Sequence, residues 1–274
     1  MTVKRLALRR PDSCCVCEIA LPAGEVALWD STERTVTCLS CVDGSTPVVD
    51  VGVAGASAEA KGRRQRERQL KGREQRKELH PILGRLVNAL EGPPTSGASW
   101  LKGASGEQLL GEVLNDMRDA GILSLHDRRM PRTKANIDHL AVAATGVWVI
   151  DAKRYRGLVK AVDRGGWFRS DVRLTVAGRD RTKLVDGVLH QASVVRSALA
   201  STPFAEVPIY GALCFIDAEW PLFSKPFAVK GVVVSWGKAL WQLVGASGEL
   251  GSDDVTAVHR HLAGALPSMI KSAT

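Results

Sequence analysis

The stretch from residue 136 to residue 154 constrains the fold most, because it holds two strand-like runs separated by a turn signal. The runs read NIDHLAVA and VWVIDAK, and Thr145 and Gly146 between them favour a hairpin turn. Apolar residues at helical spacing precede this pair of strands, and a second helix is predicted at 182–200. The pattern therefore predicts a mixed α/β domain.

The first helix of this domain is expected to begin at Ser105, whose hydroxyl can cap it. Its apolar residues recur at helical spacing and are Leu109, Leu110, Val113, Leu114 and Met117. Further strands are predicted at 122–126, 207–216 and 231–236. The simplest account is one domain, residues 101–274, with a mixed central sheet flanked by helices.

Five of the six cysteines lie near the start of the chain, in a segment predicted to be a zinc-ribbon-like module, residues 1–45. Two C-x-x-C pairs, with twenty residues between them, are formed by Cys14, Cys17, Cys38 and Cys41. Four thiolates close a tetrahedral shell around Zn²⁺ and leave no open position, so we expect the zinc to be structural. Cys15 is a spare thiol that can replace Cys14. Two disulfides are the alternative, which a chain without a secretion signal disfavours.

Residues 46–100 are predicted to be a linker that contains a basic, helical segment. From residue 59 to residue 80 there are nine Lys or Arg against four Glu, and the whole chain carries a net charge of +8. Basic clusters attract polyanions such as nucleic acid, although a solvated basic face is the alternative. No stretch is apolar and long enough to cross a membrane, and the start does not resemble a secretory signal, so a cytoplasmic location is expected.

Asp138, Asp151 and Lys153 lie at matching ends of the two predicted strands. Side chains alternate along a strand, so Asp151 and Lys153 share a face. A two-residue loop at Thr145–Gly146 pairs Asp138 with Lys153, and a four-residue loop places Asp138 opposite Asp151. A loop of odd length sends Asp138 to the other face. In the even registers the two carboxylates lie within bridging distance of one cation.

Two carboxylates, waters and a backbone carbonyl, with that of Ala152 as the candidate, suit Mg²⁺ or Mn²⁺. The ion lowers the pKa of a bound water and neutralises charge on a phosphate, and Lys153 can hold that water. The alternative is an ordinary surface ion pair at the end of a hairpin. Glu107, on the inward side of the first helix, and Gln191, within the buried stripe of the second, are further candidates for the site.

These residues resemble the nuclease-related domain, a family of the PD-(D/E)XK, or restriction-endonuclease-like, superfamily. The resemblance rests on GASGEQLLGEVLNDM, NIDHLAVA and VIDAKRYRG, followed by a helix with an inward glutamine. It implies that Asp138 and Asp151 are metal ligands, that Lys153 positions the water, and that Glu107 and Gln191 assist. The chain departs from the family at Asp151, where the longer glutamate is usual.

We therefore expect a divalent-metal-dependent nuclease that hydrolyses phosphodiester bonds in DNA, with RNA as the other candidate substrate. Arg154 and Arg156, just beyond the site, are expected to contact phosphates, although solvated loop charges are the alternative. The competing hypothesis is an adaptor protein that binds nucleic acid and has kept the fold without turnover. In a third hypothesis the zinc module docks a protein.

Overall fold

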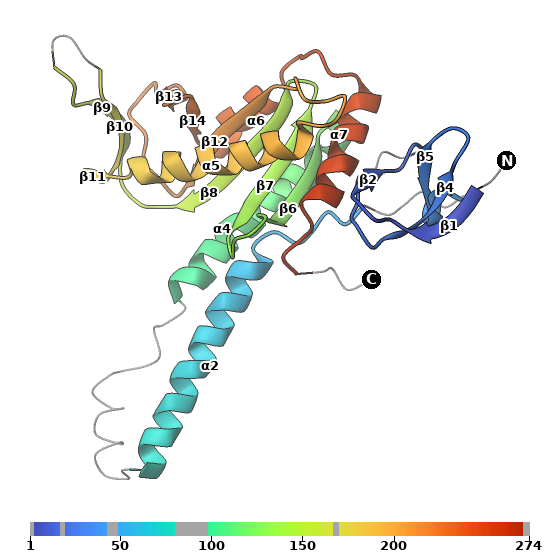
Figure 1. The fold of residues 1–274 in the computed structure, drawn as a ribbon. Coiled ribbons are helices and arrows are strands. Elements are labelled where there is room, and N and C mark those ends of the chain that lie inside the picture. The colour runs from blue at the N-terminus through green and yellow to red at the C-terminus, as the bar shows by residue number, and fades with distance from the viewer. Residues whose placement is uncertain (1–2, 17–19, 43–48, 80–97, 167–169, 271–274) are drawn as a thin grey trace.

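The structure is a computed structural model, and it describes residues 3–16, 20–42, 49–79, 98–166 and 170–270 (Figure 1). The chain forms a small N-terminal module, a long helix that projects from the molecule, and an α/β domain (Figure 1). No helix among these residues combines the length and the apolar character needed to span a membrane.

The N-terminal module is built on a three-stranded antiparallel sheet in the order β1-β4-β5. Its elements are β1 (Val3–Ala7), β2 (Asp12–Ser13), β3 (Ala20–Leu21), β4 (Val26–Asp30), β5 (Thr35–Cys38) and the short helix α1 (Leu39–Val42). Its core consists of a few apolar side chains packed with Cys14 and Cys38. The module therefore buries little apolar surface of its own.

The α/β domain has a six-stranded mixed sheet in the order β13-β14-β12-β8-β7-β6. The strands are β6 (Leu123–Arg129), β7 (Asn136–Ala143), β8 (Gly146–Arg154), β12 (Ile209–Ile216), β13 (Phe227–Val229) and β14 (Val232–Ser235). β12 runs parallel to β8 and to β14, whereas β6, β7 and β8 are antiparallel neighbours. The expected mixed sheet, preceded by a small module that carries a cysteine cluster, is confirmed.

Helices cover both faces of this sheet (Figure 1). They are α4 (Ala98–Asp116), which continues into the 3-10 turn η1 (Met117–Ala120), α5 (Thr182–Leu199), α6 (Gly237–Val244) and α7 (Ser252–Ala265). Side chains of α4 and α6 pack on one face, and those of α5 and α7 pack on the other. The expectation that the first helix begins at Ser105 is wrong, because α4 begins at Ala98 and continues through Ser105. α4 also packs against α2 (Ala56–Leu79), a tertiary contact that the local capping signal does not describe.

A second small sheet extends the domain beyond the end of β8 (Figure 1). It has the order β11-β10-β9, from β9 (Val159–Asp163), β10 (Val172–Val176) and β11 (Arg179–Asp180). Val159 and Leu174 belong to a core cluster that also contains Val185 and Leu213, so the hairpin is joined to α5 and β12 by apolar packing.

The segment before α2 packs directly against the α/β domain. The guanidinium of Arg128 is fully buried, and its nitrogens donate to the backbone oxygens of Leu266 at 2.5 Å, Ala263 at 2.7 Å and Asp50 at 2.7 Å. Burial lowers the pKa of Arg128 to about 10. One buried cation thus ties the start of this segment to the end of α7.

Candidate functional site

The turn between β7 and β8 has two residues, Ala144 and Thr145, and is flanked by the pair Ala143 and Gly146. It therefore lies one residue earlier than the turn expected at Thr145–Gly146. The loop still has an even number of residues, so Asp138 stays on the same face as Asp151, but each residue of β7 faces a residue of β8 two positions earlier than expected. The regular ladder ends at the pair His139 and Ile150. The next step of the register brings Asp138 opposite Asp151 instead of Lys153.

Asp138, Asp151 and Lys153 are in direct contact. The ammonium of Lys153 is hydrogen-bonded to Asp151, lies 3.8 Å from Oδ2 of Asp138, and is 3.3 Å from the backbone oxygen of Ala152. Both aspartates are buried, with exposed fractions of 9% for Asp138 and 6% for Asp151. A buried ion pair of this kind is a weak source of stability, because desolvation opposes the attraction. We call these three residues the acidic pair and its lysine.

The carboxyl group of Asp138 takes up a proton far more readily than an ordinary aspartate. Burial and then the neighbouring Asp151 raise its pKa well above the usual range. Burial alone would lower the pKa of Lys153, but the charges of Asp151 and Asp138 outweigh it and raise that pKa. Lys153 therefore stays a cation beside Asp138, whose carboxyl group favours its protonated form.

Glu107, on α4, is coupled to the same group by charge. Burial raises the pKa of Glu107 to about 7, while Lys153 lowers it and Asp151 raises it. The residue thus titrates near neutral pH.

Asp127 and Asn136 also belong to this region, and the sequence analysis missed them. The Nδ2 of Asn136 donates to Asp127 at 2.9 Å and to Asp138 at 3.3 Å. Asp127 also accepts from the backbone N–H of Ser57 at 3.0 Å and from its hydroxyl at 2.7 Å. Asn136 lies two residues before Asp138 on β7, and this spacing was the one available signal.

Asp127 has a φ of 52°, a left-handed conformation that is uncommon for residues other than glycine. On either side of it the alternation of β6 breaks, because Leu125 lies in the core with α7 and Arg128 also faces α7. The same core contains both Ile137 and Leu140 of β7, which are three residues apart. Asp138 therefore lies where the neighbouring strands β6 and β7 depart from regular geometry.

Comparison with known families gives one result for this region. Residues 102–216 match the family model of the nuclease-related domain. The match runs from within α4 to the end of β12, so this part of the chain is similar to the nuclease-related domain, and the resemblance seen in the sequence is confirmed. A search of curated proteins and a search of solved structures each gave no match.

The remaining predicted site residues are Gln191, Arg154 and Arg156. Gln191 lies on α5, and its Oε1 is buried with no hydrogen-bond partner among the described residues. Arg154 donates from Nε to Asp217 at 2.6 Å, and Arg156 is exposed just after β8.

Three of the predicted thiol ligands converge in the N-terminal module. The sulfur atoms of Cys14, Cys38 and Cys41 lie within 4.8 Å of one another, an arrangement that is compatible with a zinc-binding module. The described cysteines are thiols and not disulfides. Cys17 lies outside the described residues, and Cys15 is exposed with its sulfur 3.3 Å from the hydroxyl of Thr37.

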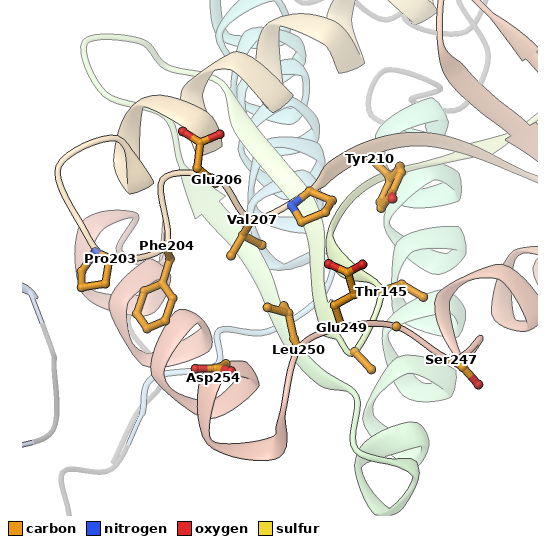
Figure 2. A pocket seen from close by; sticks show the side chains of 13 residues that line it. Thr145, Pro203, Phe204, Glu206, Val207, Tyr210, Ser247, Glu249, Leu250 and Asp254 are labelled. Carbon is orange, nitrogen blue, oxygen red and sulfur yellow. The ribbon is translucent and has the colours of Figure 1, made fainter.

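A pocket of about 660 Å³ lies at the opposite end of the sheet, beside the β7–β8 turn (Figure 2). Thr145, Phe204 and Tyr210 line it together with acidic side chains, which are Glu206, Glu249 and Asp254. Three carboxylates repel a phosphate backbone, so this pocket does not suit nucleic acid.

Proposed function

We propose that this protein is a divalent-metal-dependent nuclease that hydrolyses phosphodiester bonds in DNA. The observation that supports the proposal most is the contact between the two buried carboxyl groups of Asp138 and Asp151, with Lys153 against both. Burying charged groups costs desolvation free energy whether or not they have a function, and groups perturbed in this way cluster at functional sites. The match of residues 102–216 to the nuclease-related domain supports the same reaction class.

The donor set fits Mg²⁺ or Mn²⁺. The carboxyl groups of Asp138 and Asp151, both in contact with Lys153, form a hard, oxygen-rich site, and a divalent cation can replace the proton that burial favours on Asp138. Asp138 and Asp151 would hold the ion, and the carbonyl of Ala152 is the backbone candidate. Such an ion supplies a bound water of lowered pKa and neutralises charge on the scissile phosphate.

The chain's own residues orient the reactants around that position. Lys153 stays protonated and donates hydrogen bonds, so we assign it to hold the attacking water against the phosphorus. Glu107, whose pKa is about 7, is assigned to exchange a proton near neutral pH. Gln191, with a buried acceptor that lacks a partner, is assigned to assist, and Arg154 and Arg156 to bind phosphates.

We further propose that Cys14, Cys17, Cys38 and Cys41 hold a structural Zn²⁺ in residues 1–45, that residues 46–100 are a linker with a basic helix, and that residues 101–274 form the catalytic unit. The exposed basic side chains of α2 favour nucleic acid as the partner, with RNA as the second candidate. A cytoplasmic location remains part of the proposal.

The test is a cleavage assay with the purified protein on plasmid, linear and single-stranded DNA, and on RNA, with Mg²⁺, Mn²⁺ or a chelator. We expect Lys153→Ala to lower the rate by at least about 100-fold, as for loss of a group that positions a reactant. The matched control is Lys230→Ala, because Lys230 also pairs with an aspartate, Asp186, but lies on the exposed surface. Cleavage at the wild-type rate by Lys153→Ala would remove this residue from the mechanism.

The second candidate function is binding of nucleic acid without turnover. The observation that favours it is the ammonium of Lys153 in contact with both carboxyl groups, which occupies the position that a cation needs. This function predicts salt-sensitive binding and no cleavage with any divalent metal.

A further inference from the structure

The loop from Asp217 to Pro226 begins beside the acidic pair. β12 runs parallel to β8 and places Phe215 next to Lys153, so both strands end at the same edge. The first residue of the loop, Asp217, is bound by Arg154 from the end of β8. The loop therefore leaves the sheet at the edge where the candidate site lies.

The base of this loop is held firmly. The backbone N–H of Glu219 donates to Gly157 at 3.0 Å, and that of Val159 donates to Glu219 at 2.9 Å. The ring of Trp220 lies 4.9 Å from the ring of Trp236, measured between centroids, within the core cluster of β12, β13 and β14. The loop thus has a fixed direction where it emerges.

The tip of the loop exposes two large apolar side chains to solvent. Leu222 is 85% exposed and Phe223 is 91% exposed, the highest values among the large hydrophobic residues that the structure describes. The tip is a tight turn, because Ser224 donates from its backbone N–H to the oxygen of Pro221 at 3.0 Å and from its hydroxyl at 2.6 Å. The ring of Phe223 is therefore exposed to solvent and not packed against protein.

The backbone at Phe223 is also unfavourable. Its φ is 62°, and it occupies the third position of the turn, where a left-handed conformation favours glycine or asparagine. The chain thus places a bulky ring at a strained position and leaves it in solvent. The hydrogen bonds of Ser224 hold the turn, but the 91% exposed ring of Phe223 gains little from packing, which is the pattern expected of a residue that contacts an external ligand.

We propose that Leu222 and Phe223 form a stacking tip for unpaired bases of the nucleic-acid substrate. This inference rests on the proposed function and names its substrate class, nucleic acid with a single-stranded segment next to the cleavage point. Aromatic rings stack on bases of any sequence, and apolar wedges enter between unstacked bases. Phe223 lies six residues beyond Asp217, a reach of at most about 20 Å.

The tip is tested by binding measurements in a chelator, where no hydrolysis occurs. The full-length protein is titrated against a fluorescent single strand of about 20 nucleotides and against the matched duplex, with anisotropy as the readout. Phe223→Gly is expected to weaken single-strand binding roughly tenfold, as for loss of one stacked base, and duplex binding less than about twofold. Phe223→Trp keeps the stacking ring, so we expect it to retain single-strand affinity.

Thermal unfolding separates this effect from misfolding. Phe223→Gly relieves the left-handed strain, so its midpoint should rise or stay level while binding falls. Leu243→Ser is the control, because Leu243 is an exposed apolar residue (37%) far from the tip. It lies on α6 next to Val244, whose backbone oxygen accepts a hydrogen bond from Thr145 in the β7–β8 turn, at the opposite end of the sheet. This variant should leave both affinities unchanged.

The possible outcomes test the stacking tip separately from the proposed nuclease function. Wild-type single-strand affinity in Phe223→Gly overturns the stacking tip even if the protein cleaves DNA. Equal losses for single strand and duplex also overturn it, as does a protein that binds no nucleic acid. Selective loss of single-strand binding in a protein that cleaves nothing supports the tip and rejects the nuclease.

Discussion

The N-terminal module and the α/β domain are stabilised by different means. The α/β domain has three clusters of buried apolar side chains around a six-stranded sheet. The module has one small cluster, and two of its six fully buried members are cysteines. Apolar burial can account for the fold of the larger region, whereas the smaller one needs another source of free energy. We therefore expect that loss of the metal unfolds the module, whereas substitutions in the apolar core destabilise the α/β domain.

The largest expected effect is on the module alone. Removal of the proposed Zn²⁺ by a strong chelator should unfold it, because binding of the ion to the four proposed thiolates would contribute an apparent free energy of roughly 10–16 kcal/mol. Hydrogen exchange measures this directly: we expect β1, β4 and β5 to lose protection while β7 and β8 keep it. Cys38→Ser should behave like the chelator, and Cys15→Ser should not, since Cys15 lies outside the sulfur cluster. Lasting protection of β4 after metal loss would contradict the comparison.

The next effect concerns the site in the α/β domain, where function and stability should separate. Burial already favours the protonated form of Asp138, which the amide of Asp138→Asn resembles. We expect the free energy of unfolding to change by less than about 1 kcal/mol, while cleavage falls by at least about 100-fold because the proposed metal ligand is lost. Calorimetry and the DNA assay measure the two quantities. A large loss of stability would show that the acidic pair holds the fold together.

Acid should destabilise the α/β domain through two buried histidines. Burial lowers the pKa of His126 and of His259 to about 4, so both stay neutral in the folded protein while the unfolded chain takes up protons near pH 6.5. The unfolded state then binds more protons between about pH 6.5 and pH 4, and the free energy of unfolding falls as the pH falls through that window, by about 3 kcal/mol for each histidine.

Glu107 acts in the opposite direction, since its raised pKa makes the folded state bind a proton between about pH 4.5 and pH 7. Urea titrations of the wild type and of His259→Gln at several pH values therefore isolate one histidine. The amide of glutamine can still donate to the oxygen of Ser124, which His259 contacts at 3.0 Å. A smaller loss of stability in acid is expected for the variant, and identical pH profiles would exclude His259 as a cause.

The sequence was sufficient where local pattern decides the structure. Two apolar strands around a tight turn predicted β7 and β8, and the parity of the loop predicted that Asp138 and Asp151 meet. The pairing itself was off by one residue on each strand, because Ala144–Thr145 and Thr145–Gly146 are both acceptable turns.

Contacts between distant segments could not be predicted in this way. Ser57 binds Asp127 across 70 positions, and the left-handed backbone of Asp127 has no glycine to signal it. These two facts place Asp127 beside Asn136 and hence beside the acidic pair. Periodicity in the sequence describes one helix or strand at a time, whereas this part of the site combines residues from three elements, α2, β6 and β7.

The smallest effect tests whether close packing also holds the segment before α2. Gly111 of α4 faces Ala54, and a Cβ at Gly111 would lie 2.4 Å from the Cβ of Ala54. Gly111→Ala should therefore destabilise the domain by about 1–3 kcal/mol, although alanine is the better helix former. Gly187→Ala on α5 is the matched control, because a Cβ there meets no atom within 4 Å, and it should raise stability by up to about 1 kcal/mol. Denaturant unfolding measures both. If both variants are stabilised, residues 49–58 can move away from α4 without loss of stability. The segment would then behave as a linker rather than as part of the α/β domain.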